Sequence, residues 1–213
     1  GTCGYWTLVS SNLDASFSDP RGTGKYSIQL TDLLNKNITY TVSGFNKTFT
    51  GPVTGGRLEY SKSVKEFDQS YGNGNPPKRG NGTKIASKLT DDFEDDPDRS
   101  EYSRQLVERD ADGIRTGTTY IISGYKPDFS GAPAGSRLNY SKSEADPVNN
   151  WTRSTSNLAD DFAVQASTKY SRSCSGSAAY CGVTTDLDDD FDPADEVTYS
   201  ISNYDSDFTD SDD

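Results

Sequence analysis

Short runs of β-branched and aromatic residues, separated by turn residues, recur along the whole chain. Three matching runs span residues 39–43, 119–123 and 198–202. Residues 57–60 and 137–140 alternate, which places a leucine and its polar neighbour on opposite faces of a strand. Glycines mark the turns between these runs at matching positions: Gly44, Gly51 and Gly55, then Gly124, Gly131 and Gly135. The pattern predicts short β-strands joined by turns.

A helical pattern is confined to single turns near residues 32–35 and 64–69. Regular short strands with turns roughly every 8–12 residues favour β-sandwiches over a parallel sheet covered by helices. The predicted fold class is therefore all-β: tandem small β-sandwich (jelly-roll-like) modules with almost no helix.

One segment is repeated along the chain. Residues 39–63 and 119–143 are identical at 13 of 25 positions, and a shortened copy starts at Thr198. Upstream of each copy stands the pattern L-x-[AD]-[SD]-F, at residues 13–17, 89–93 and 158–162. Repeats of this length indicate tandem modules that build surfaces and spacers. We predict a leader, 1–10, and three β modules, 11–86, 87–155 and 156–213.

The repeat alignment also predicts equivalent positions in the three modules. Tyr40, Tyr120 and Tyr199 with their strands should superpose, which would bring Phe49, Phe129 and Phe208 into equivalent core environments. The third copy has no counterpart of the segments 57–63 and 137–143 after Phe208.

The apolar content is low for a folded protein. Leu, Ile, Val and Phe make up 36 of 213 residues, and the net charge is −12, a combination that approaches the composition of disordered chains. The 13 tyrosines and the regular turns argue for folding instead. We expect neighbours, bound ions or glycans to supply part of the stability.

Several features predict an extracellular or cell-surface glycoprotein. No segment is apolar enough to span a membrane, and the chain starts at Gly1 with no Met, as a processed mature protein does. Five N-x-[ST] sequons are candidate glycosylation sites: Asn37, Asn46, Asn81, Asn139 and Asn150.

The three cysteines fit the same compartment. Cys174 and Cys181 flank a loop of six residues, and we predict a disulfide between them. Cys3 is then the odd cysteine, either free or joined to another subunit. The alternative is three unrelated reduced thiols.

The order of motifs resembles a known family of secreted repeats. An acidic L-x-D-D-F with D-P is followed by Y-S-x-Q-L and then by G-T-T-Y-I-I-S-G-Y with a later Phe, over residues 87–130. This order is similar to bacterial β-sandwich repeats of the pre-peptidase C-terminal (PPC) type. The resemblance implies a jelly-roll-like accessory or surface module without catalytic residues of its own.

Charge changes sign along the chain. The net charge is +4 over residues 1–86, −4 over 87–155 and −12 over 156–213. A solvated acidic tail explains such an end in the ordinary way. The other interpretation is head-to-tail association, because repeated heterologous contacts between unlike surfaces produce open filaments.

Two acidic clusters suggest calcium, which prefers oxygen ligands supplied by loops. The candidate ligands are Asp91, Asp92 and Asp95 in one cluster and Asp188, Asp190 and Asp192 in the other. The alternative is a pair of solvated acidic loops, in which case the protein has no cofactor.

Catalysis and nucleic-acid binding are disfavoured. With no histidine, the chain cannot build a Ser-His-Asp or Cys-His arrangement or an imidazole metal ligand. The carboxylates lie in Asp-rich loops that resemble no glycosidase pair, and the acidic balance opposes binding to phosphate backbones. We predict that the protein is not an enzyme.

Two classes of function remain. The first is a secreted structural protein, a subunit of an extracellular filament or surface layer that assembles with itself by strand addition. The leader residues Tyr5, Trp6, Thr7, Leu8, Val9 and Ser10 would complete the third module of the next subunit.

The second class is a carbohydrate-binding or calcium-dependent adhesive surface module. Trp6 and Trp151 would then stack on glycans, whereas in a structural protein each would cover an apolar edge.

Overall fold

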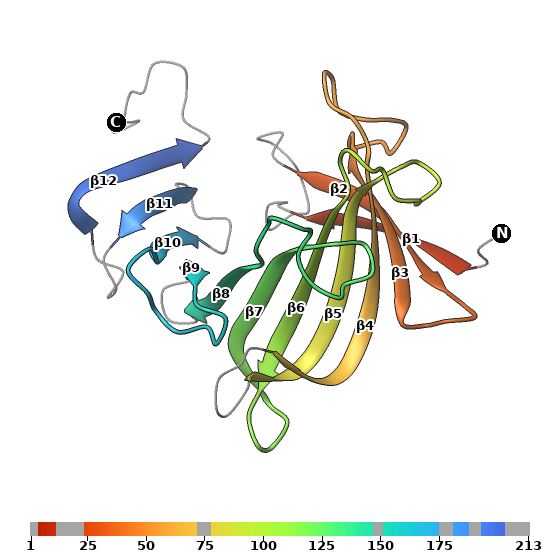
Figure 1. Ribbon diagram of the computed structural model, residues 1–213. Coiled ribbons are helices and arrows are strands. Elements are labelled where there is room, and N and C mark those ends of the chain that lie inside the picture. Colours follow the sequence, from red (N-terminus) through yellow and green to blue (C-terminus); the bar gives the residue numbers. More distant parts are fainter. Residues whose placement is uncertain are drawn as a thin grey trace, which may run out of the picture.

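The protein is all-β. The computed structural model describes residues 4–11, 24–71, 78–146, 151–174, 181–187 and 193–202, and no helix occurs among them. Twelve strands, numbered along the chain, cover most of these residues (Figure 1): β1 (Gly4–Ser11), β2 (Lys25–Asp32), β3 (Ile38–Phe45), β4 (Glu59–Tyr71), β5 (Lys78–Leu89), β6 (Glu101–Arg109), β7 (Arg115–Tyr125), β8 (Asn139–Asp146), β9 (Trp151–Leu158), β10 (Lys169–Cys174), β11 (Cys181–Leu187) and β12 (Pro193–Ser202). The predicted fold class is confirmed at this level.

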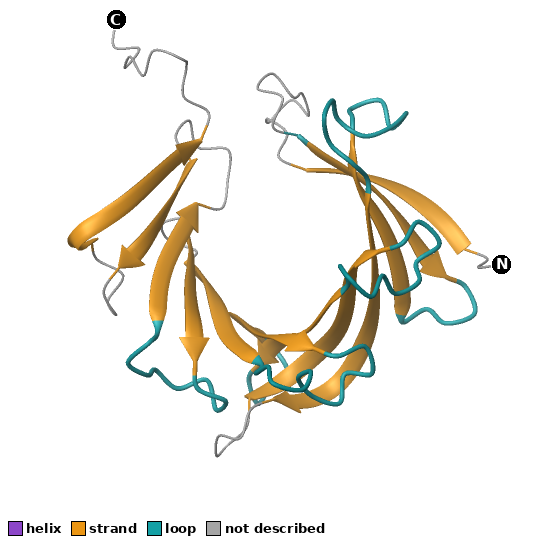
Figure 2. Cartoon of the chain, turned by 45° about the horizontal axis from the view of Figure 1, so that its top comes forward, coloured by secondary structure: helices purple, strands orange, loops and turns teal. Residues whose placement is uncertain are grey.

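The twelve strands form one antiparallel sheet in which every strand pairs with its neighbours in sequence. Figure 2 shows this sheet curving into an open U, with β1 on one arm and β12 on the other. Sequence alternation predicted small sandwiches, whereas the described strands make a single continuous layer. The expected module boundaries after residues 86 and 155 fall inside β5 and β9. Each of these strands pairs continuously with the following strand across the boundary, and a bulge interrupts only its pairing with the preceding strand.

One predicted helical turn is wrong. Residues 64–69 belong to β4, where Val64 pairs with Ile38 on one side and Lys84 on the other. Sheet pairing on both sides outweighs the weak helical preference of this short segment. Residues 32–35 do form a local turn, closed by the Asp32 carboxylate, which accepts the backbone N–H of Leu34 at 2.8 Å.

The two faces of the sheet differ in composition. The inner face, defined as the face that contacts the loops between odd and even strands, holds the buried apolar side chains of the described chain. They are Tyr26, Leu30, Val42, Leu89, Tyr102, Leu106, Tyr120, Ile122 and Leu158, with Phe162 from a loop above them. Leu106 in β6 is completely buried and forms a core cluster with its neighbours in β7 and β9. The core therefore lies between the sheet and its own loops.

The outer face carries mainly serine and threonine. Cross-strand partners on this face include Ser27 with Ser43, Thr31 with Thr39, Ser103 with Ser123, Thr119 with Ser143 and Ser154 with Ser171. Most of these hydroxyl side chains are half-exposed. Because a second sheet would have to bury apolar side chains against this face, the hydroxyl pattern explains why the described strands form one layer.

Four loops with a common backbone geometry fold against the inner face. These Phe loops (residues 46–58, 90–100, 126–138 and 159–168) each hold a phenylalanine in the left-handed region: Phe49, Phe93, Phe129 and Phe162, with φ between 56° and 66°. In each loop the phenylalanine N–H donates to the carbonyl three residues earlier, for example Phe129 to Lys126 at 2.9 Å. A bulky residue in this region costs free energy, which its ring packing must offset.

Each Phe loop follows a β-bulge opposite a Tyr-Ser pair. In β3, Tyr26 pairs with Phe45 but Ser27 pairs with Ser43, so Gly44 is the extra residue, with φ of 88°. Gly124 has the same place opposite Tyr102, with φ of 87°. A Cβ on Gly44 would lie 2.6 Å from the Arg57 carbonyl oxygen, so this position requires glycine.

The phenylalanines then pack on the preceding even strand. Phe49 lies edge-on to Tyr26 with ring centroids 5.6 Å apart, and Phe129 lies edge-on to Tyr102 at 5.7 Å. The predicted equivalence of Phe49 and Phe129 is thus confirmed, while Phe208 lies outside the described residues. Phe93 on Tyr60 and Phe162 on Tyr140 repeat the same contact.

The structural repeat is therefore shorter than the sequence repeat. All six even strands contain Tyr-Ser, in β2, β4, β6, β8, β10 and β12. Tyr199 belongs to this series, because it lies in β12, whereas Tyr40 and Tyr120 lie in the odd strands β3 and β7. The predicted equivalence of Tyr199 with Tyr40 and Tyr120 is wrong. The unit is one odd strand, one Phe loop and one even strand.

Candidate functional sites

The residues predicted to drive assembly form the first edge of the sheet. Tyr5 to Ser10 lie in β1, which pairs along its whole length with β2 of the same chain, from Gly4 opposite Asp32 to Ser11 opposite Lys25. The leader is therefore a strand of its own sheet and has one backbone edge left. No charged side chain occurs in its eight residues, and Tyr5, Trp6 and Leu8 are 76%, 55% and 62% exposed.

The other edge of the described sheet is β12, which pairs only with β11. Its sequence contains Pro193, Asp195 and Glu196, and it comes from the acidic end of the chain. Unpaired N–H and C=O groups on an edge strand are a template for another strand, and charge or proline weakens that tendency. The β1 edge has neither of these protections.

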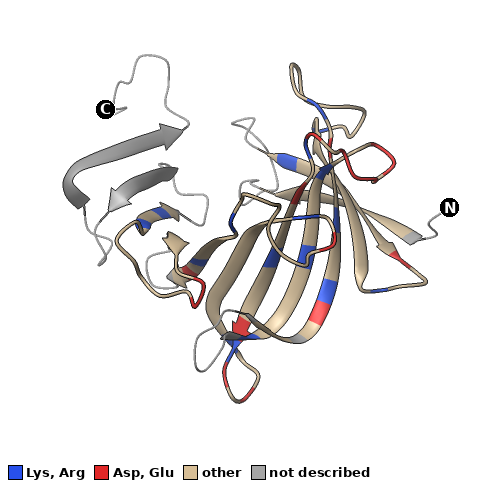
Figure 3. Cartoon of the chain, in the orientation of Figure 1, with Lys and Arg blue, Asp and Glu red and all other residues tan. Residues whose placement is uncertain are grey.

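A hollow of about 590 Å³ lies over β4, β5 and β6 on the inner face. Its lining includes the basic side chains of Lys62 and Lys84 and the aromatic rings of Phe93, Tyr102 and Phe129. Figure 3 shows basic residues on these middle strands and acidic residues in the loop after β5. In Figure 1 the green loop between β7 and β8 passes in front of the sheet, and its Phe129 carbonyl accepts the Arg104 guanidinium at 3.2 Å.

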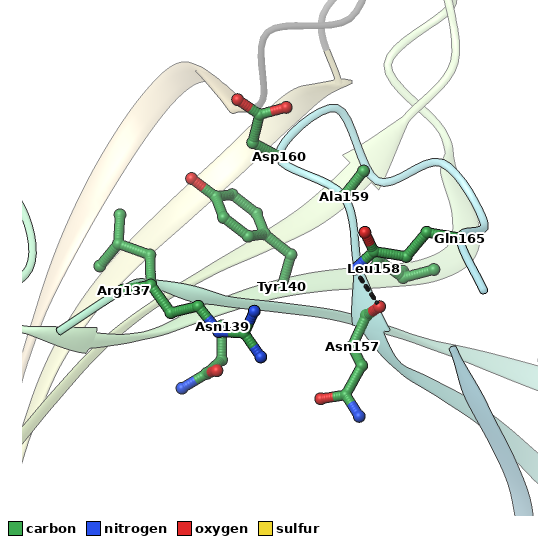
Figure 4. A pocket seen from close by; sticks show the side chains of 9 residues that line it. Arg137, Asn139, Tyr140, Asn157, Leu158, Ala159, Asp160 and Gln165 are labelled. Carbon is green, nitrogen blue, oxygen red and sulfur yellow. Dashed lines mark hydrogen bonds between the residues drawn. The ribbon is translucent and has the colours of Figure 1, made fainter. Parts of the chain in front are cut away.

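A smaller hollow of about 180 Å³ is formed by the start of β8 and the last Phe loop (Figure 4). Asn139, Asn157 and Gln165 surround it together with Arg137, and Gln165 Nε2 donates to the Asn157 carbonyl at 2.7 Å. Beside the earlier Phe loop of residues 90–100, the corresponding position holds ion pairs, including Lys88 with Glu101. This hollow is smaller than the ~300–1,000 Å³ of typical ligand sites.

The acidic residues predicted to bind calcium do not converge where they are described. Asp91, Asp92 and Asp95 are exposed in the loop after β5. Thr90 donates its hydroxyl to the Asp92 carboxylate, which lowers the pKa of Asp92. Within the described ranges, no three acidic or cysteine side chains are grouped as a metal would require. Asp188, Asp190 and Asp192 lie outside those ranges.

The sequons fall into two groups. Asn37 and Asn139 are exposed, in the turn after β2 and at the start of β8. Asn46 is half-buried, and its Nδ2 donates to the Thr50 hydroxyl at 3.2 Å. The half-buried Asn81 faces Arg109, whose guanidinium its amide oxygen accepts at 3.2 Å. Asn150 lies outside the described residues.

The disulfide between Cys174 and Cys181 stays a prediction. Cys174 is the last residue of β10 and Cys181 the first of β11, so the two belong to one hairpin. Their side chains, that of Trp151 and the whole of Cys3 lie outside the described part of the chain.

Buried tyrosine hydroxyls are the most perturbed titrating groups of the described chain. Burial, with a hydrogen bond to Asp95, raises the pKa of Tyr102 to about 12. Burial and the nearby Glu108 carboxylate raise the pKa of Tyr120 further still, and the Tyr120 hydroxyl donates to Glu108 at 3.1 Å. These phenols are structural hydrogen-bond donors that hold the inner face together.

Comparison with known proteins gives no relative: no family model, curated protein or solved structure matches this chain. The expected PPC-type kinship therefore stays a prediction. None of the residues described here forms a helix long and apolar enough to cross a membrane.

The inner-face hollow was not predicted from the sequence. The signal that could have found it is the residue after each Tyr-Ser pair, because a tyrosine and the residue two positions later share one face of a strand. That residue is Lys62 in β4, Arg104 in β6 and Lys142 in β8.

Proposed function

We propose that this chain is a secreted structural subunit that assembles head to tail, by addition of β12 of one copy to the free edge of β1 of the next. The observation that carries the proposal is the β1 edge, an uncharged strand with large exposed side chains. Long uncharged edges otherwise invite uncontrolled pairing, so an edge of this kind is expected to have a partner.

Strand direction supports the same assembly. Neighbouring strands of the sheet are antiparallel, so the first strand, β1, and the twelfth, β12, have opposite directions. A β12 strand beside β1 of the next copy would therefore extend the antiparallel pattern without a break. The contact joins two different surfaces, and contacts of this kind produce open filaments when the rotation does not close.

Charge supports the pairing of unlike ends. The first 86 residues have a net charge of +4 and residues 156–213 a net charge of −12. Complementary potentials guide the encounter and disfavour contact between like ends. Exposed sequons at Asn37 and Asn139 agree with an extracellular location for the assembled protein.

The test is the size distribution of the purified chain by sedimentation and electron microscopy. Wild type should form polymers whose length grows with protein concentration. Thr7→Lys places a charge on the exposed edge strand and should reduce polymers to single subunits. The matched control, Thr31→Lys, adds the same charge to the same face one strand inward, where both backbone edges are paired, and should assemble as wild type.

Two results would overturn the proposal. One is a wild-type protein that stays a single subunit at every concentration. The other is a Thr7→Lys variant that polymerises as well as the Thr31→Lys control.

A further inference from the structure

Two of the four Phe loops make a ring contact with the preceding odd strand that the Phe129 loop lacks. Phe93 and Phe162 each touch a second ring, from the odd strand two positions back in the sheet: Tyr40 at 5.1 Å and Tyr120 at 4.8 Å. The equivalent residue for Phe129 is Lys84 in β5, because Val64 pairs with Lys84 as Leu30 pairs with Tyr40. The Lys84 ammonium lies 5.7 Å from the Phe129 ring centre.

The neighbouring inner-face position of β5 has changed as well. Ala86 stands where β3 has Val42 and β7 has Ile122, which are both buried. In β5 a lysine and an alanine thus stand where β3 and β7 have a tyrosine and a branched apolar residue. The same two positions of β9 hold Arg153 and Thr155. These smaller side chains of β5 widen the hollow of about 590 Å³, which is within the size range of sites for small organic ligands.

The charges in the hollow are arranged unevenly. Lys62 is half-buried, and its ammonium lies 5.6 Å from the Tyr40 ring with no carboxylate partner among the described residues. Lys84 pairs with Glu66 at 2.9 Å. The lining carboxylates of Glu94 and Asp95 are exposed. The Lys62 ammonium is thus the basic group of the hollow that lacks a counter-charge.

The next strand carries a further basic group, which contacts Phe129 and does not itself line the hollow. The Arg104 guanidinium lies over Tyr125 at 5.3 Å and over Phe129 at 5.8 Å, and its buried Nε has no hydrogen-bond partner. A buried donor without an acceptor costs free energy. Arg104 borders the hollow through Phe129, to whose carbonyl it donates.

We propose that this hollow binds an acidic sugar. The apolar faces of a pyranose ring fit against the rings of Phe93 and Phe129, and its hydroxyls match the polar rim. The sugar carboxylate would pair with the Lys62 ammonium, a charge-assisted bond that a neutral sugar lacks. The site lies over β4–β6, away from both sheet edges, so it is independent of the proposed assembly.

The test is calorimetric titration of the full chain with galacturonic acid trisaccharide and with galactose trisaccharide, which lacks the carboxylates. The acidic sugar should bind at least about tenfold more tightly than the neutral one, and added salt should weaken that binding. Lys62→Gln should cost about tenfold in affinity for the acidic sugar. Lys142→Gln, the equivalent change in β8 outside the hollow, should leave affinity unchanged.

Ala86→Ile tests the hollow itself. It restores the side chain that β7 carries at this position, and it should abolish binding while circular dichroism shows an intact β-sheet. The proposal is overturned if wild type binds neither sugar, if it binds both equally, or if the folded Ala86→Ile variant keeps wild-type affinity.

Discussion

The ring of Phe129 stands edge-on to the ring of Tyr102, with centroids 5.7 Å apart and planes at 86°. Phe129 comes from the loop between β7 and β8, whereas Tyr102 opens β6, so the contact ties each unit to the unit before it. Edge-to-face aromatic pairs are worth roughly 0.5–1.5 kcal/mol beyond the area they bury. Four such contacts connect the described units, and together with the area that the rings bury they act against the cost of four phenylalanines in the left-handed region.

Removing one of these rings should weaken the fold measurably. We expect Phe129→Ala to lower the free energy of unfolding by about 2–3 kcal/mol, less than for a fully buried phenylalanine, because the ring is only half-buried. Chemical denaturation followed by circular dichroism measures this. Val164→Ala, at a 64% exposed loop position, is the control and should change stability by less than about 0.5 kcal/mol. Equal effects of both would show that the ring contact contributes little.

Two bulge glycines and one loop glycine should respond to substitution in a graded way. Gly44→Ala should cost about 2–3 kcal/mol, because the new Cβ would lie 2.6 Å from the Arg57 oxygen at a φ of 88°. Gly124→Ala should cost about 1 kcal/mol, since its Cβ would lie 3.3 Å from the Arg137 oxygen. Gly51→Ala meets no atom within 4 Å and should be nearly neutral. Thermal unfolding of the three variants gives the order, and a different order would contradict the bulge geometry.

Alkaline pH should destabilise the fold through Tyr102. Its pKa is about 12 in the folded chain and about 10 when unfolded, so above pH 10 the unfolded state loses this proton first. Stability is therefore fully present below pH 10 and is lost as pH rises towards 12. Phenolate absorbance and unfolding free energy measured together should show this fall. In Tyr102→Phe the fall should be shallower, because the remaining buried phenols alone would contribute.

Distant substitutions should add. Leu30→Ala in β2 and Leu158→Ala in β9 each remove a buried side chain and should each cost about 2–4 kcal/mol. Among the described strands, contacts run only between neighbours in the sheet and between β4 and β6, so the double variant should equal the sum within about 0.5 kcal/mol. A coupling free energy above about 1 kcal/mol would show that the two arms of the sheet are energetically coupled, which would contradict this prediction.

Glycan occupancy should follow side-chain exposure. When the chain is secreted from a glycosylating host, mass spectrometry should find glycans on Asn37 and Asn139, which are exposed. Asn46 and Asn81 should be empty or poorly occupied, because their amides take part in bonds within the fold. Full occupancy of Asn46 would show that exposure in the folded chain does not govern modification here.

The pattern of short β-forming runs and turns was sufficient to predict the all-β class, and the repeat alignment was sufficient to predict the shared environment of Phe49 and Phe129. Neither could show that L-T-D-D-F at 89–93 and F-N-K-T-F at 45–49 are the same element. Their common property is a left-handed phenylalanine four residues after a bulge partner, which is a backbone property and not a letter pattern.

The pattern of apolar and polar residues could not predict that the sheet forms a single layer. Alternation identifies which residues share a face but not what covers that face. The serine and threonine side chains of the outer face, such as Ser103 and Ser123, could have argued against a second sheet. The hollow beside Lys84 and Ala86 lies where β3 and β7 have larger side chains, and this difference becomes visible only once the correct unit is aligned.

The contact of each loop phenylalanine with the preceding unit has an evolutionary consequence. Each unit of two strands supplies a loop phenylalanine that packs on the preceding unit, and a Tyr-Ser tyrosine on which the phenylalanine of the following unit packs. Duplication or loss of one unit would preserve strand direction, and every remaining loop phenylalanine would still have a tyrosine to pack on. Genes of this kind can therefore lengthen or shorten by whole hairpins, and the width of the sheet becomes a heritable quantity that changes in steps of two strands.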